Sequence, residues 1–187
     1  MAVSAIARHV YQEHLDYFGE PDESFVYENK NAPADYPDRM DIFVWKASAD
    51  VPITTFSTIG MATRPMAGAE HRAELHFSVR GSIDKATLGQ GSMFLANLAM
   101  HPFIGGTHFD WWHKVRDPGA IPLYSRASSV IFHPRFVDTG WDAMQFDSTP
   151  IKILNVVPIT PDEYAIQEIS KLQDHWMNIE VDLFEPR

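Results

Sequence analysis

The sequence contains no cysteine, and this absence removes several classes of chemistry. Disulfides, thiolate zinc sites, iron–sulfur clusters and cysteine nucleophiles all require that side chain. Long apolar runs are absent too, because no segment approaches the roughly 20 residues of a membrane span. The first residues, "MAVSAIARHV", lack a basic region followed by a long apolar run. We therefore expect a soluble, unprocessed protein with a cytoplasmic location.

Positive charge is scarce: 15 basic side chains face 25 acidic ones, and the formal net charge is −10. A surface of that sign repels nucleic acid phosphates and anionic lipid. We expect neither a nucleic acid partner nor a membrane partner. The charge itself has two interpretations, since it either only keeps the protein soluble or attracts a partner with a basic surface.

Catalytic signatures are missing as well. The chain has no G-x-S-x-G, no H-E-x-x-H, no Walker-type phosphate loop and no dinucleotide fingerprint. "GQGS" at 89–92 lacks the following lysine and is expected to be a turn before a helix. Acid and imidazole do lie close in sequence, so the alternative function is a hydrolase or metal-dependent enzyme that uses His71, Glu74 and His76. Such pairs are common on the polar faces of strands.

Apolar side chains are plentiful, at 45% of the 187 residues, and twelve per cent of the residues are aromatic. This is enough to bury a core, and the length predicts a single domain over 1–187. Val3, Ile6 and Val10 recur at helical spacing and predict a helix over 3–18 that Gly19 ends.

The middle of the chain reads as a sheet, with strand-like runs "MDIFVWKA", "PITTFSTIG" and "HRAELHFSV". In the third run an apolar set alternates with a polar set that includes Glu74 and His76, which predicts one buried and one polar face. Gly60 is expected to end the second strand in a turn with positive φ, and Arg64 to stay exposed.

A second helix is expected over 92–100, where Pro102 prevents its continuation. Further strands are expected at "SSVIFHP" and "IKILNVVP". Thr160, Pro161 and Glu163 then match the start of a capped helix that continues to Trp176. The predicted fold class is α+β, a mixed and mainly antiparallel β-sheet packed with helices.

The stretch "FIGGTHFDWWHKV" at 103–115 concentrates histidine, aspartate and tryptophan. If a strand follows Gly106, side chains alternate between faces, so that His108 and Asp110 share one face and His113 lies on the other. The two histidines then point apart. A zinc site needs ligands that converge on one point, so we expect no metal and no cofactor.

Five strings, in this order along the chain, are similar to the suppressor of fused family in its compact bacterial form: "DIFVWKASADVPITTFSTIGMATRPM", "RAELHF", "FLANLAMHPF", "GGTHFDWWHK" and "IKILNVVPITPDEY". The resemblance is strongest over residues 37–172 and covers the N-terminal domain of the eukaryotic proteins. It implies a suppressor of fused N-terminal-domain-like fold. It also implies binding rather than chemistry.

Eukaryotic members of that family hold a transcription factor peptide as an added strand between two domains, and only the first domain has a counterpart here. Small bacterial members serve as immunity proteins that neutralise a toxin of a polymorphic toxin system. The resemblance places His101 at a tyrosine that lines the peptide groove, and Thr107 at an aspartate that contacts the peptide. Both contact residues have changed. The backbone of a strand edge in the same place could still accept a partner strand.

The leading hypothesis is therefore a non-enzymatic protein-binding domain, an immunity protein whose cognate partner is a toxin. Its predicted partner-binding residues are His101, Thr107, His108, Phe109 and Asp110. The enzyme named above is the alternative. A structural role within a homo-oligomer is a third, since exposed aromatic side chains can equally mark self-association.

Overall fold

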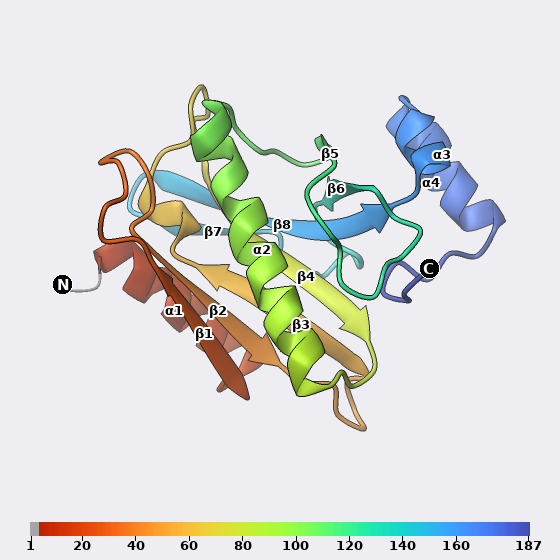
Figure 1. The fold of residues 1–187 in the computed structure, drawn as a ribbon, viewed down its shortest axis with the longest axis horizontal. Helices are drawn as coiled ribbons and strands as arrows, with labels where there is room; N and C mark the ends of the chain where they lie inside the picture. Colours follow the sequence, from red (N-terminus) through yellow and green to blue (C-terminus); the bar gives the residue numbers. More distant parts are fainter. Residues whose placement is uncertain (1–3) are drawn as a thin grey trace.

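A computed structural model describes residues 4–187, which form an eight-stranded mixed sheet (Figure 1). The strand order is β1-β2-β3-β4-β8-β6-β5, and β7 pairs with β8. All pairs are antiparallel except β4 with β8. The strands are β1 Glu23–Glu28, β2 Arg39–Trp45, β3 Ile53–Ile59, β4 Arg72–Arg80, β5 Lys114–Arg116, β6 Ser129–His133, β7 Ala143–Phe146 and β8 Thr149–Ile159. The predicted α+β class is confirmed.

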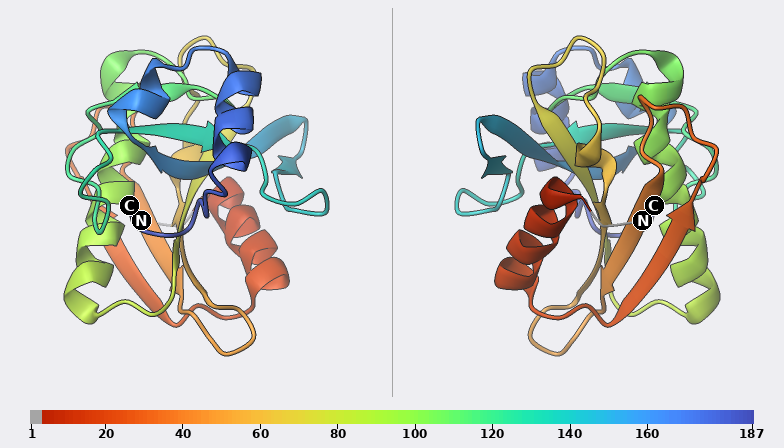
Figure 2. Two further views of the ribbon diagram at one scale, coloured as in Figure 1. Left: turned by 90° about the vertical axis from the view of Figure 1, so that its right-hand side faces the viewer. Right: turned by 90° about the vertical axis from the view of Figure 1, so that its left-hand side faces the viewer.

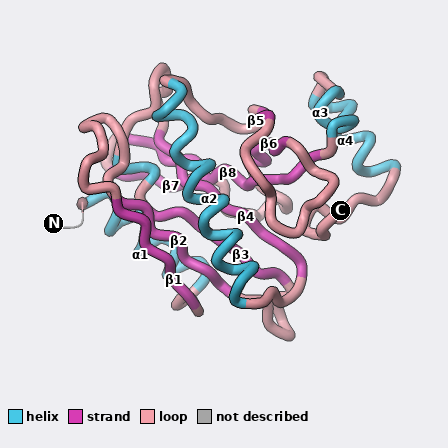
Figure 3. Tube along the Cα trace, in the orientation of Figure 1, coloured by secondary structure: helices cyan, strands magenta, loops and turns pink. Residues whose placement is uncertain are grey.

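Helices cover both faces of the sheet, as the edge-on views show (Figure 2). Helix α2 crosses one face and α1 lies against the other, while α3 and α4 follow the end of β8 (Figure 3). The helices are α1 Ala5–Phe18, the 3-10 turn η1 Met61–Thr63, α2 Lys85–Gly105, α3 Pro161–Ala165 and α4 Ile169–Asn178. Within residues 4–187, no helix has the length and apolar character to cross a bilayer.

The opening helix is confirmed from Ala5 onward, and Val3 lies outside the described residues. Val10 is fully buried in a small apolar cluster with Ile59 and Ile153. The structure corrects one prediction about β4. His76 contacts His14 of α1, and the turn after β3 covers Glu74, so Glu74 and His76 do not lie on a polar face but are 0% and 4% exposed.

Helix α2 is longer than predicted at both ends. Asp84 caps its first turn through the amides of Ala86 and Thr87, so "GQGS" lies inside the helix rather than in a turn before it. The helix also runs through Pro102 to Gly105, against the prediction that proline stops it. A proline removes a single i to i−4 bond, and here it does so within the last turn.

The helix start at Thr160 is confirmed, with both hydrogen bonds of the capping box to Glu163 present. The predicted continuous helix is wrong, because the chain forms two helices with a break between Ala165 and Ile169. The ammonium group of Lys114 occupies the break, where it donates to the carbonyl oxygens of Glu163, Tyr164 and Ile166. These bonds tie the end of α3 to β5.

The turn after β3 follows the prediction at one residue and departs from it at another. Gly60 has φ 134°, as expected, and a Cβ there would lie 2.6 Å from the carbonyl oxygen of Arg39. Arg64 is half-buried rather than exposed, because its Nε donates to the carbonyl oxygen of Tyr36.

Candidate partner-binding hollow at the β5 edge

Residues 107–113 are irregular, so the prediction of a strand directly after Gly106 is wrong. The Asp110 carboxylate accepts the Trp111 amide at 2.7 Å and forms an ion pair with Lys152. The His113 amide donates to the Asp110 carbonyl, and Trp112 has a positive φ of 67°. These contacts turn the chain, and regular pairing with β6 begins only at Lys114.

The turn also overrides the predicted alternation of faces. The rings of His108 and His113 do not point apart, since their centroids lie 5.3 Å from each other. Phe109 points inward, is 5% exposed and packs on Phe132 with ring centroids 4.6 Å apart. Trp111 holds the turn against the sheet, because its Nε1–H donates a hydrogen bond to the carbonyl oxygen of Ile153 in β8.

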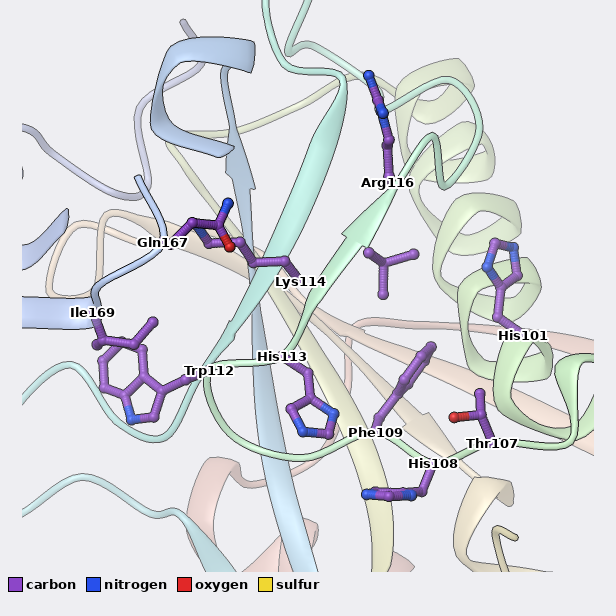
Figure 4. A pocket seen from close by; sticks show the side chains of 11 residues that line it. His101, Thr107, His108, Phe109, Trp112, His113, Lys114, Arg116, Gln167 and Ile169 are labelled. Atoms are coloured by element: carbon purple, nitrogen blue, oxygen red, sulfur yellow. The ribbon is translucent and has the colours of Figure 1, made fainter. Parts of the chain in front are cut away.

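Four of the five predicted site residues line one open hollow of about 630 Å³ (Figure 4): His101, Thr107, His108 and Phe109. His101 comes from the last turns of α2, and the other three come from the irregular segment. The fifth residue, Asp110, is not part of the lining and pairs with Lys152 behind it.

Other residues of the hollow were missed by sequence reasoning: Trp112, His113, Lys114, Val115, Arg116, Gln167 and Ile169. They come from the β5 strand, the turn before it, the segment between α3 and α4, and the first residue of α4. The sequence signal that could have found some of them is the pair Lys114 and Arg116, two cations in one short strand of an acidic chain.

Strand β5 is an edge of the sheet, since β6 is its only partner strand within residues 4–187. On the side of β5 that faces β6, the His113 carbonyl accepts from the Phe132 amide, and the Asp117 amide donates to the Ser128 carbonyl. Antiparallel strands turn alternate residues toward and away from a neighbour. The main-chain groups of Lys114 and Arg116 therefore face away from β6, toward the hollow's side of the sheet.

The hollow is basic in character. Its lining carries three histidines with Lys114 and Arg116, and no aspartate or glutamate. Desolvation lowers the pKa of Lys114 and that of His101, which favours the neutral form of each side chain. Arg116 has a side chain that is 74% exposed, and it is the most accessible cation there.

The residues of the enzyme alternative have separate structural partners. The Nε2 of His71 lies 2.9 Å from the carbonyl oxygen of Phe109. The Glu74 carboxylate accepts bonds from the Thr58 hydroxyl and from the amides of the turn at Gly60–Ala62. Burial raises the pKa of Glu74 to about 7, and these donors act in the opposite direction.

His76 pairs instead with His14 from α1, with 3.0 Å between their Nε2 atoms. The Nδ1 of His14 donates to the carbonyl oxygen of Val10, and its Nε2 lies 2.7 Å from the Ser57 hydroxyl. Burial lowers the pKa of His14 to about 4 and that of His76 well below its ordinary value. Over residues 4–187, no group of three or more histidine or carboxylate side chains is arranged to hold a metal ion.

Comparison with solved structures identifies the fold. The chain is similar to a chain of the Sufu-Fu complex, at 13% identity and a TM-score of 0.59, over 96% of this chain and 84% of that one. A SUFU homolog from Neisseria gonorrhoeae FA 1090 shares 10% identity and a TM-score of 0.58, over 95% and 92%. Drosophila Suppressor of Fused has 15% identity and a TM-score of 0.53, over 85% of this chain and 42% of its own.

At the level of sequence, no curated protein matches the chain. The model of the family described as Suppressor of fused protein (SUFU) matches residues 36–185. This range contains all five predicted site residues and extends beyond the resemblance seen over 37–172. The chain belongs to the Suppressor of fused family.

Proposed function

We propose that this chain is a non-enzymatic protein-binding domain that accepts an extended segment of a partner along the β5 edge. The observation that carries the proposal is the position of the hollow beside a sheet edge with outward main-chain groups at Lys114 and Arg116. Backbone bonds to an added strand supply affinity, and pockets for alternate side chains supply specificity. His101, Thr107, His108 and Phe109 line that pocket, and Asp110 holds its turn in place.

Strand β1 is another edge of the sheet, and its terminal glutamates, Glu23 and Glu28, pair with Lys46 and Arg39 within the chain. At β5 the edge adjoins the hollow, and the side chain of Arg116 is 74% exposed. The Sufu-Fu complex, a structure with the same fold, also supports a protein partner.

The partner that we propose is a toxin, and the chain is then its immunity protein in a polymorphic toxin system. The family resemblance supports this role. The net charge of −10 supports a toxin with a basic surface, which an acidic protein attracts at long range. The absence of cysteine fits a cytoplasmic location. We also take residues 1–187 as one domain, because the sheet is continuous from β1 to β5.

Co-expression with toxins encoded by neighbouring genes tests the role. We expect the wild-type chain to restore growth of cells that produce its cognate toxin, and to bind that toxin in calorimetry. Thr107→Arg should weaken binding at an unchanged melting temperature, because Thr107 is exposed and lines the hollow. A Thr107→Arg protein that binds with full affinity would place the interface elsewhere.

A matched control changes stability without changing the lining of the hollow. Phe77→Ala removes a ring that is buried in the main core and is not part of that lining, and it should destabilise the protein by about 3 to 5 kcal/mol. The contrast with Thr107→Arg separates a loss of binding from a loss of folding. Toxicity that the wild-type chain never relieves, for any neighbouring toxin, would remove the immunity role.

A further inference from the structure

The charge of the hollow is opposite to that of the chain. The chain carries a net charge of −10 with its histidines taken as neutral, yet the two side chains of the lining that carry a formal charge, Lys114 and Arg116, are both basic. The sign of the charge in this cavity is therefore opposite to the sign of the net charge of the protein. Close charges decide which segment is held, because the Debye length is about 8 Å at physiological salt and distant surface charges are screened.

The basic side chains of the hollow differ in whether their donor groups are available to a partner. The ammonium group of Lys114 already donates hydrogen bonds to the carbonyl oxygens of Glu163, Tyr164 and Ile166. Lys114 therefore contributes a fixed positive field rather than a free donor. His113 and Arg116 are exposed, and Figure 4 shows Arg116 at one end of the hollow and His113 below it.

Arg116 is exposed and remains accessible to a partner. Its Cζ lies 5.7 Å from the centroid of the Tyr164 ring. Its Nε lies 3.8 Å from Oδ2 of Asp117, and these two side chains are 74% and 79% exposed. Pairs this exposed contribute about 0 to 1 kcal/mol. A carboxylate brought in by a docked strand can therefore replace Asp117 at little cost, and the fork of the guanidinium suits a bidentate contact.

We infer that the segment seated in the hollow is acidic: an extended stretch of the partner with aspartate or glutamate at alternate positions. This inference rests on the proposed function. The partner's backbone pairs with the outward main-chain groups of Lys114 and Arg116. Residues along a strand alternate between faces. Every second side chain of the partner segment then lies on the face of Arg116, where a carboxylate can pair with the guanidinium.

Nucleic acid phosphate is the other anion with suitable chemistry, and the observations disfavour it. The field of the whole chain repels a polyanion. Lys114 and Arg116 are the two fixed cations of the lining, far fewer than the 6 to 10 phosphate contacts of a typical site. A free strand edge offers main-chain groups that match a peptide backbone.

Two fluorescent eight-residue peptides test the inference by fluorescence polarisation on the full chain: one alternates threonine with glutamate, and its twin alternates threonine with lysine. We expect the glutamate peptide to bind about tenfold more tightly, the effect of one well-placed charge pair. Arg116→Glu should abolish that preference. Lys30→Glu, an equal charge change at an exposed loop position after β1, should leave it intact.

Each outcome bears on the inference. Equal binding of the two peptides, tighter binding of the lysine peptide, or equal effects of Arg116→Glu and Lys30→Glu would overturn it. Displacement of the glutamate peptide by a single-stranded oligonucleotide would overturn it as well, in favour of a phosphate ligand. All of these results leave the proposed function standing if Thr107→Arg still weakens the partner complex. The proposed site fails separately if Thr107→Arg has no effect on that complex.

Discussion

At the scale of single residues, two of the buried histidines, His14 and His76, are held neutral by their surroundings. His14 and His76 share one hydrogen bond in a packed aromatic cluster that includes Trp141. Desolvation lowers both pKa values, His14 to about 4. A histidine whose folded pKa lies below its unfolded value contributes stability above pH 6.5, and this contribution is lost as the pH falls toward the folded pKa.

Acidification should therefore destabilise the protein. From the pKa of about 4, His14 by itself should remove about 2 kcal/mol of unfolding free energy between pH 7 and pH 4.5. Urea denaturation across that range measures the loss. In His14→Gln and His76→Gln proteins the decline should be shallower than in wild type. His175→Gln, outside the pair, should follow the wild-type curve, and a wild-type stability independent of pH would contradict this account.

At the scale of elements, the sequence predicts the helices and strands whose residue pattern fits only one type of secondary structure. The strands around "DIFVW", "TTFST" and "AELHF" and the cap at Thr160 were found because alternation and capping are local signals. The polar residues of β4 were misassigned because their burial, by α1 at His76 and by the turn after β3 at Glu74, is a tertiary event. Strand β1 was missed, since its half-buried side chains, Phe25 and Tyr27, pack on the main core, where the Tyr27 hydroxyl lies 2.8 Å from that of Ser92 in α2.

The sequence predicted which segment contributes to the candidate site, but it did not predict the conformation of that segment. Thr107, His108 and Phe109 were named, but the turn that joins His108 to His113 depends on the ion pair of Asp110 with Lys152. The two residues of that pair lie 42 positions apart in the sequence. No local pattern encodes such a contact.

Helix α2 offers a matched pair of glycines. A Cβ at Gly91 would lie 2.8 Å from Cζ of Phe56, whereas nothing lies within 4 Å of one at Gly89. Gly91→Ala should therefore destabilise the protein by about 1 to 3 kcal/mol through overpacking. Gly89→Ala should stabilise it by about 0.5 to 1 kcal/mol through helix propensity. Thermal unfolding of both proteins checks the signs, and equal shifts would show that α2 does not press on β3 this closely.

The end of α3 depends on a side chain from another element. Lys114→Met removes the donor to three carbonyl oxygens and should cost about 1 to 3 kcal/mol. Hydrogen exchange should accelerate at residues 164–168. Lys171→Met is the control, because Lys171 is exposed and pairs with the exposed Glu168. This substitution should change stability by less than about 0.5 kcal/mol. Equal effects of the two substitutions would remove the capping role of Lys114.

At the scale of the whole molecule, two charge effects act over different ranges. The net charge of −10 acts on the approach of a partner, and the basic hollow acts on the segment that is seated. The first is screened by salt more strongly than contacts within the complex are. The effect of the net charge on the association rate and the effect of the hollow on the dissociation rate can therefore be measured separately.

For a toxin with a basic surface, association should slow by about tenfold between 50 and 500 mM salt. Dissociation should change less over the same range. Stopped-flow mixing or surface plasmon resonance provides both rates. Arg116→Glu should act mainly on dissociation, since Arg116 lines the hollow. An association rate that is independent of salt would leave the acidic surface with the role of keeping the protein soluble.

The central claim is that a partner strand adds to the β5 edge. Amide hydrogen exchange resolved by residue, in the free chain and in complex with the partner, tests it most directly. The account predicts that the outward amides of Lys114 and Arg116 gain protection in the complex. The inward amide of Asp117, already bonded to the carbonyl oxygen of Ser128, should change little. Protection that appears along β1 at Glu23–Glu28, with Lys114 and Arg116 unchanged, would contradict the claim.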